Sequence, residues 1–235
     1  MLLVAAFMSL QISAQYSGGG SNISVNSSSF GVLNFDNSGA WNKVFITDRK
    51  VNANYQTGSP FINDEWQLAN IILLENKAEI LNVPVRIDAK FNLIEINHEG
   101  VVKVLHATNT YSLAFKTTEE VFVTGQTLGI SEPEGFFKII YNKKSSLLCH
   151  YSTKIIRGAY NAVLDAGIKE DKLLVEQTYY IYRDGKLIKL EKNRKKLLKQ
   201  FIDQPEIVQY IKDQHITPNE EYDLLKLVDF IDSRS

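Results

Sequence analysis

A thiol and an imidazole stand next to each other at Cys149 and His150, in the segment LLCHYSTK. A cysteine activated by a histidine is an arrangement that nucleophilic catalysis uses. The segment has the composition of a β-strand, however, and adjacent residues of a strand point to opposite faces. We therefore expect Cys149 to be a small buried apolar side chain rather than a nucleophile. It is the only cysteine, so the chain forms no internal disulfide.

The remaining titratable residues predict little further chemistry. His98 lies in the turn HEG and His106 at the far end of the strand that follows, so a hairpin holds them apart. The acidic pairs at 64–65 and 119–120 each precede a strand, where charge is usually solvated, although paired carboxylates can also act as acid and base or bind a cation. GQTLG lacks the ending of a phosphate-binding loop. We expect no metal site, no cofactor and no catalytic residues, and a hydrolase that uses surface carboxylates is the remaining enzyme hypothesis.

Lysines dominate the segment YYIYRDGKLIKLEKNRKKLLKQF, residues 179–201. Such a density of cations could neutralise the phosphates of a nucleic acid. On a helix, however, these lysines lie opposite an apolar face that begins at Leu197, and residues 200–235 are acidic enough to offset their charge. We therefore expect a solvated helix face and no nucleic-acid partner. The alternative is contact with an anionic envelope surface or glycan through Lys192, Lys195, Lys196 and Lys199.

Aromatic residues recur in the later strands and could line a hollow that binds a ligand. The alternative is that they fill the core beneath a C-terminal helical segment. The candidates for ligand binding are Phe137, Tyr141, Tyr151, Tyr180 and Tyr182.

A period of two in hydrophobicity, with β-branched and aromatic residues, is the strongest signal over residues 41–191. Turn residues separate these segments at intervals of roughly 8 to 12 residues, which is typical of consecutive antiparallel strands. We predict an antiparallel meander curled into a roll or partial barrel. Within it, residues 125–135 are expected to form a loop, and residues 155–171 a short helix or an excursion at the sheet edge.

The period changes to 3.6 after Lys192 and predicts two to three helices over residues 192–235. Asp203 and Thr217 are the expected N-caps of the second and third helices, because each precedes a proline and stands three residues before a glutamate. The last helix carries an apolar stripe that must be buried against another element. The expected fold is therefore α+β, mainly β, with the helical segment packed on the meander.

The segment MLLVAAFMSLQISAQ predicts an export signal over residues 1–14, with an apolar run and a small residue, Ala14, at the cleavage site. No lysine or arginine precedes the run, which is also too short to span a bilayer. Residues 15–40 are rich in Gly, Ser and Asn and are expected to be flexible. Gln15 stands where a lipid anchor would need a cysteine. We expect a soluble periplasmic or extracellular protein without a lipid anchor or transmembrane span.

Several segments together resemble uncharacterised exported proteins of Bacteroidota-type bacteria. They are the apolar start, TGSPFINDEW, VPVRIDAKFNLIEI, FFKIIYNKKSSLL, the lysine-rich segment and LLKLVDFID. The similarity is one of layout over most of residues 41–235. It implies export and carries over no activity and no functional residues.

The overall composition is ordinary for a soluble protein, and a formal net charge of −1 identifies no class of partner. The expected function is that of a non-catalytic binding protein or an envelope interaction protein, which would present a sheet edge or a helix face to an envelope protein. The alternative is a carrier or sensor that holds a small apolar or glycan ligand in the curl of the sheet.

Overall fold

A computed structural model describes residues 57–74, 78–98, 100–116, 118–161, 166–167 and 170–234. The predicted export signal, the flexible segment and the beginning of the predicted β region lie outside these residues. The strands are β1 (Thr57–Gly58), β2 (Gln67–Leu73), β3 (Glu79–Asp88), β4 (Leu93–His98), β5 (Val101–His106), β6 (Thr110–Phe115), β7 (Val121–Thr124), β8 (Phe136–Asn142), β9 (Ser146–Ile156), β10 (Tyr160–Asn161), β11 (Ala166–Gly167), β12 (Lys172–Arg183) and β13 (Lys186–Lys189). The helices are the 3₁₀ turn η1 (Ala107–Asn109), α3 (Gly125–Leu128), α4 (Arg194–Gln200), α5 (Pro205–Asp213) and α6 (Glu221–Ser233).

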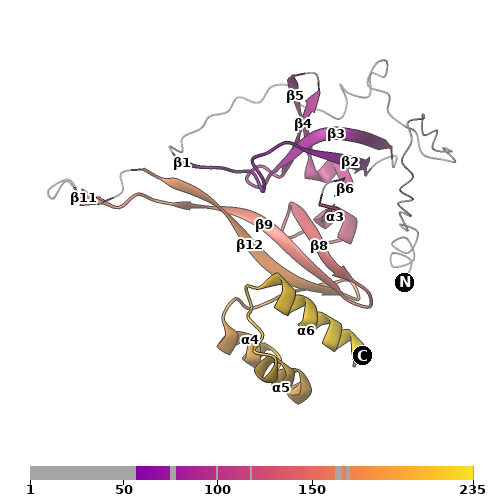
Figure 1. Cartoon of the computed structure of the whole chain (residues 1–235), viewed down its shortest axis with the longest axis vertical. Coiled ribbons are helices and arrows are strands. Elements are labelled where there is room, and N and C mark those ends of the chain that lie inside the picture. Colours follow the sequence, from indigo (N-terminus) through magenta and orange to yellow (C-terminus); the bar gives the residue numbers. More distant parts are fainter. Residues whose placement is uncertain are drawn as a thin grey trace.

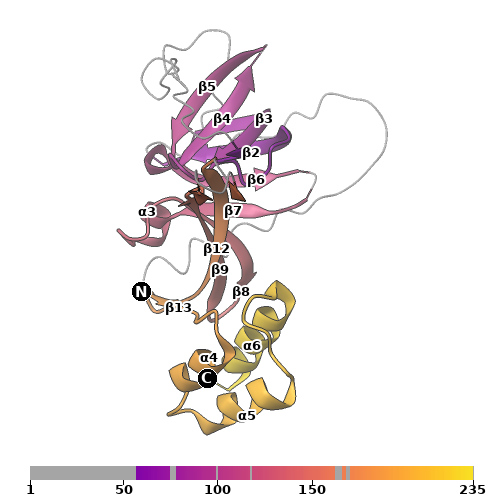
Figure 2. The same cartoon turned by 90° about the vertical axis from the view of Figure 1, so that its left-hand side faces the viewer.

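Most of these strands form one eleven-stranded sheet that does not close into a barrel. The strand order is β1-β12-β9-β8-β7-β6-β2-β3-β4-β5, and β13 pairs with β12. Figures 1 and 2 show the long strands β8, β9 and β12 running from the body of the sheet towards helices α4–α6. The predicted mainly β fold with C-terminal helices is confirmed.

The connectivity differs from a single meander. β2 pairs with β3 on one side and with β6 on the other, so the chain returns from the edge strand β5 to the middle of the sheet. β1 pairs with β12 in parallel, which makes the sheet mixed rather than wholly antiparallel. Period-two patterning determines which face of a strand is buried, but it does not select the strand's partner.

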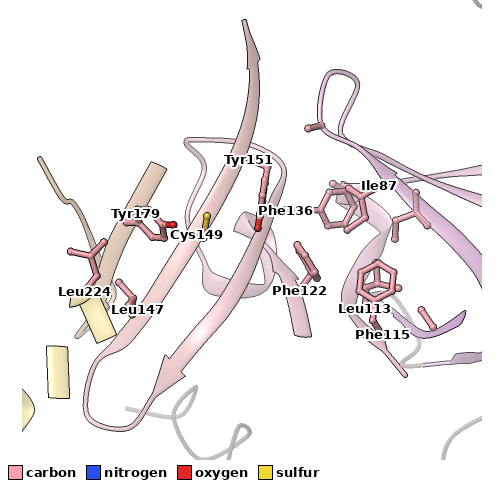
Figure 3. Packing of buried hydrophobic residues seen from close by; sticks show 14 of the residues in the cluster. Ile87, Leu113, Phe115, Phe122, Phe136, Leu147, Cys149, Tyr151, Tyr179 and Leu224 are labelled. Atoms are coloured by element: carbon pink, nitrogen blue, oxygen red, sulfur yellow. The ribbon is translucent and has the colours of Figure 1, made fainter. Parts of the chain in front are cut away.

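The main hydrophobic core follows one face of the sheet from the helices to the opposite end. Figure 3 shows Leu224 of α6 beside Leu147, then Cys149 and Tyr151 along β9, then Phe122 and Ile87. A second, smaller core lies on the other face and contains Val123, Leu128, Phe137 and Leu148. The middle of the sheet is therefore covered on both sides.

Polar contacts tie α6 to strand β8 and to the turn between β8 and β9. Lys138 Nζ lies 2.8 Å from Glu221 Oε2 at the beginning of α6. Near the end of the helix, the Ser145 N–H donates to Asp232 Oδ2 at 2.9 Å, and Lys144 Nζ donates to the Asp232 carbonyl at 3.1 Å. The predicted packing of the last helix on the sheet is thus reinforced at both of its ends.

Both predicted N-caps are wrong. Gln204 and Glu220 occupy the cap positions of α5 and α6, and neither side chain caps its helix. Residues 217–220 instead form a turn, in which the Glu220 N–H donates to the Thr217 carbonyl at 3.1 Å. The Thr217 N–H donates to Asp223 Oδ2, so the polar contact runs back from the helix to Thr217.

The two segments that the sequence leaves irregular contain short elements. Residues 125–128 form the single helical turn α3, where a loop was expected. β9 extends to Ile156, and the short pair β10 and β11 follows, which agrees with an excursion at the sheet edge.

Candidate functional site

Cys149 and His150 lie on opposite faces of β9, as their adjacency predicts. Cys149 is fully buried in the main core, and burial raises the pKa of its thiol to about 11. His150 packs against the Phe137 ring on the other face, with the ring centroids 4.8 Å apart. Burial lowers the pKa of His150 from its ordinary value. These two side chains do not form a nucleophile and base pair.

The five aromatic candidates do not gather around one hollow. Phe137, Tyr180 and Tyr182 belong to the core on the second face, where the Tyr182 hydroxyl donates to the Leu128 carbonyl at 2.8 Å. Tyr141 and Tyr151 belong to the main core on the opposite face. The Tyr141 hydroxyl donates to Asp229 Oδ1 at 2.9 Å. The structure thus separates these side chains into two groups.

The curl of the sheet contains a small polar cavity of about 260 Å³. Tyr151 is the one aromatic candidate that lines it, beside Arg86, Glu120, Lys138 and amide side chains. Ligand pockets commonly have volumes of roughly 300 to 1,000 Å³ and a largely apolar lining. The volume of this cavity lies below that range, and its lining is more polar than is usual. The curl therefore offers little room for an apolar ligand.

The charged side chains of this small cavity pair with one another. Lys138, whose side chain is 12% exposed, lies 3.3 Å from Glu120 and 2.8 Å from Glu221. Burial acts to lower the pKa of Lys138, but hydrogen bonds and charge from Glu221 and Glu120 outweigh it and raise the pKa. Arg86 donates to Glu95 Oε2 at 2.8 Å. These ion pairs join neighbouring strands of the sheet, and the pair with Glu221 also joins β8 to α6.

A larger cavity of about 490 Å³ lies beside α3. Its lining comes from three segments that are distant in sequence. They are residues 91–92 before β4, residues 106–108 after β5, and residues 124–135 between β7 and β8. The predicted loop 125–135 therefore supplies most of the lining.

Hydrogen bonds fix the α3 wall of this cavity against β6. Thr124 Oγ1 donates to the Thr110 carbonyl at 3.0 Å, and Thr127 Oγ1 donates to the Tyr111 carbonyl at 2.7 Å. Thr124 also accepts from the Thr127 N–H and so caps α3. The Ala107 N–H donates to the Asn92 carbonyl at 2.9 Å and so holds the segment after β5 against residues 91–92.

The loop between α3 and β8 is held equally closely. His150 Nε2 lies 2.8 Å from the Glu134 carbonyl, and a carbonyl only accepts, so Nε2 carries the donating proton. Gly135 has φ +113°, and a Cβ there would lie 2.5 Å from Asn92 Oδ1. This close approach requires glycine at position 135. The cavity walls are consequently preformed.

The lining of the α3 cavity combines polar, uncharged side chains with a larger area of apolar surface. Phe91, which is 51% exposed, and Ile130 add apolar surface, while His106 and Glu134 are the titratable side chains. The other polar side chains are Asn92, Thr108, Thr124, Gln126 and Ser131. Within the described residues, no hydrogen bond joins His106 to Ser131 or Glu134.

The sequence missed this cavity because its residues are not neighbours along the chain. Gly125, Gly129 and Gly135 are the only local signal, and they predict a loop without indicating what packs against it. The acidic pairs considered as catalytic groups lie elsewhere: Asp64 accepts from the Ser59 hydroxyl and Glu120 pairs with Lys138.

The lysine candidates lie on the exposed side of the helical segment. The four side chains are solvent-exposed, and no ion pair forms between them and a carboxylate in the described part of the chain. The acidic residues after position 200 pair instead with other cations, Asp229 with Lys143 and Glu206 with Arg234. Lys199 also lines a groove between α4 and α5, beside Lys212.

Comparisons with protein-family models, curated proteins and solved structures give no match for this chain. Among the described residues, no group of three or more His, Cys, Asp or Glu side chains is placed to bind a metal ion. Within the same residues, no helix combines the length and the apolar character needed to cross a membrane.

Proposed function

We propose that the protein is a non-catalytic binding protein that is exported and holds a small polar ligand, such as a sugar unit, in the α3 cavity. The observation that supports this proposal is the cavity of about 490 Å³, whose walls are held by hydrogen bonds and whose lining includes amide and hydroxyl groups. Its volume lies within the range of roughly 300 to 1,000 Å³ that small-molecule sites have.

The lining suits a neutral ligand that carries both polar and apolar surface. Asn92 and Gln126 supply amide groups that both donate and accept, and Thr108 and Ser131 supply hydroxyls. Phe91 contributes a partly exposed ring. A ligand with several hydroxyl groups and one apolar face would satisfy both kinds of surface.

Export is supported by sequence alone, through the apolar run of residues 2–10 and the small residue Ala14. With Cys149 as its one cysteine, the chain cannot form an internal disulfide. A denatured mass that corresponds to a chain beginning near Gln15 would support export. A mass that still includes residues 1–14 would argue against it.

Native mass spectrometry tests the binding proposal directly. The protein would be isolated gently from cells that express the full chain, and its native and denatured masses would be compared. We expect the native mass to exceed the denatured mass by a few hundred daltons, because a preformed site retains its ligand. A bare native mass would count against the proposal.

Two tryptophan variants localise the retained ligand. Thr108 is exposed and lines the α3 cavity, so Thr108→Trp fills part of its volume and should abolish the excess mass. Lys186 is exposed on β13 and does not line the cavity, so Lys186→Trp is the matched control and should keep it. Retention of the ligand by Thr108→Trp would place the site elsewhere.

A further inference from the structure

Helices α4 and α5 enclose a shallow groove of about 510 Å³. It shares no residue with the α3 cavity, so it is independent of the proposed function. Its lining consists of Leu198, Lys199, Ile202, Pro205, Val208, Gln209 and Lys212.

The opposite sides of both helices are anchored in the main core. Leu197 and Phe201 are buried on α4 and the turn after it, and Ile207 and Ile211 are buried on α5. The Gln200 side chain donates to the Lys189 carbonyl at 2.7 Å and so attaches the end of α4 to β13. The groove is therefore preformed, which lowers the entropic cost of binding a partner.

The two helices run in opposite directions along the groove. The Arg194 guanidinium at the beginning of α4 donates to the carbonyls of Ile211 and Lys212 at the end of α5, at 3.3 and 3.4 Å. Ile202 and Pro205 consequently lie at the end where the chain turns, and Lys212 lies at the other end. Lys199, near the end of α4, lies on the side of the turn, so the groove has one lysine towards each end.

The apolar part of the groove is exposed to solvent. Ile202 is 68% exposed, and Leu198 and Val208 are partly exposed. On α5 the lining residues recur at positions 205, 208, 209 and 212, which is the spacing of one helix face. This face extends over roughly 10 Å, the length of about two helical turns.

No carboxylate is among the side chains that line the groove, whereas Lys199 and Lys212 are. Both lysines are exposed, and neither forms an ion pair within the described residues. Asp213 accepts from the Gln209 side chain, and Glu206 pairs with Arg234. Asp203, an exposed carboxylate next to Ile202, lies at the turn and is not part of the lining.

We propose that this groove binds an amphipathic helix of a partner protein, one with an apolar stripe flanked by Asp or Glu. The exposed aliphatic floor matches the stripe, and the two lysines match the carboxylates. A helix lying in a preformed apolar groove is a common mode of peptide recognition. A grooved surface with the exposed carboxylate of Asp203 next to it at the turn suits a helix better than an anionic membrane, which would repel that carboxylate.

Two synthetic peptides of about 18 residues can test the charge preference. This length is chosen because isolated helices shorter than about 12 to 15 residues are marginal in water. One carries a leucine stripe flanked by glutamates, and its twin has lysines in place of the glutamates. Both are labelled and titrated with the full chain by fluorescence anisotropy. We expect the acidic peptide to bind about tenfold or more tightly than its twin, which corresponds to about 1.4 kcal/mol, and less tightly at high salt.

Charge reversal in the protein provides the decisive control. Lys199→Glu/Lys212→Glu should invert the preference, so that the basic peptide binds more tightly. Lys172→Glu/Lys186→Glu changes the net charge equally at exposed positions on β12 and β13, and should leave the preference unchanged. Ile202→Ser should weaken binding of the acidic peptide to wild-type protein. Circular dichroism checks that each variant is folded.

Equal binding of the two peptides would overturn the proposal, as would absence of binding by both. It would also be overturned if the reversed pair kept the wild-type preference. Vesicles of equal parts phosphatidylglycerol and phosphatidylcholine provide a further arm. If the wild-type protein bound these vesicles through Lys199 and Lys212 but did not bind the acidic peptide, the partner would be a lipid surface instead.

Discussion

Position 150 shows how a single side chain can link a core to a loop that lines a cavity. His150 packs on Phe137 in the second core, while its Nε2 hydrogen-bonds to the Glu134 carbonyl in the wall of the α3 cavity. The opposite orientation of Cys149 follows from strand geometry and was predictable. The contact with Glu134 was not, because it depends on how the loop before β8 folds back over the sheet.

Acidification should destabilise the protein through His150. Burial lowers the pKa of His150 in the folded state, so folding favours the neutral ring. Its contribution is fully present above the unfolded pKa of about 6.5 and is lost as the pH falls through that value. We expect the urea midpoint to decrease between about pH 7.5 and pH 5. In His150→Gln, whose amide can still donate to Glu134, this decrease should be smaller, and an unchanged decrease would exclude His150 as its cause.

Cys149 should be unreactive in the folded protein. Its side chain is fully buried, and burial raises its pKa to about 11, so little thiolate forms near neutral pH. A colorimetric thiol reagent should therefore label the native chain much more slowly than the chain in denaturant. Rapid labelling without denaturant would show that β9 opens readily or that the thiol is accessible.

At the scale of elements, the placement of α6 depends on carboxylates whose roles the sequence does not distinguish. Asp229 and Asp232 are three residues apart on the same helix. Asp232 is buried and accepts from the Ser145 N–H, whereas Asp229 is exposed and pairs with Lys143 and Tyr141. Their difference arises from the turn between β8 and β9, which reaches only one of them with a backbone donor.

Removal of the Asp232 carboxylate should be far more costly than removal of Asp229. Asp232→Ala leaves the buried Ser145 N–H without its acceptor, and the expected loss of unfolding free energy is about 1 to 3 kcal/mol. Asp229→Ala, the matched control on the same helix, should cause a much smaller loss, since exposed ion pairs contribute little. Urea denaturation of the two variants measures both losses. Equal losses would contradict the role given to Ser145.

At the scale of the whole molecule, the exposed lysines of α4 are separate from the ion pairs that join the last helix to the rest of the fold. The main core extends from the helices to the far end of the sheet (Figure 3). The acidic helices pair with sheet residues such as Lys138 and Lys143 rather than with the lysines of α4. The expected offset between the lysine run and its acidic neighbours therefore does not involve direct ion pairs in the described part of the chain.

Neutralising the exposed face of α4 should leave the fold intact. Lys195→Gln/Lys196→Gln/Lys199→Gln removes three exposed charges that form no ion pair within the described residues. Each exposed substitution is expected to change stability by about 0.5 kcal/mol or less. Thermal denaturation monitored by circular dichroism measures the change. A marked decrease in the melting temperature would show that these lysines are structural, and would remove them as candidates for partner contact.

Local sequence patterns were enough to predict most of the strands and the change to helices after Lys192. They also predicted that Cys149 and His150 lie on opposite faces of one strand. These features are local, because the hydrophobic period depends only on neighbouring residues and on whether one face is buried. The first residues of the helices were harder to predict. Thr217 and Asp203 have the right neighbours for caps, but the turns before α5 and α6 place the caps at other residues.

The strand order and the candidate sites could not be predicted and became known from the assembled fold. β6 pairs with β2, a strand more than thirty residues earlier, and this pairing brings residues 91–92, 106–108 and 124–135 around one cavity. The groove between α4 and α5 likewise depends on which helix faces meet the core. Pairing and packing between distant segments are selected by the energy of the whole assembled sheet and core, and no local pattern encodes that choice.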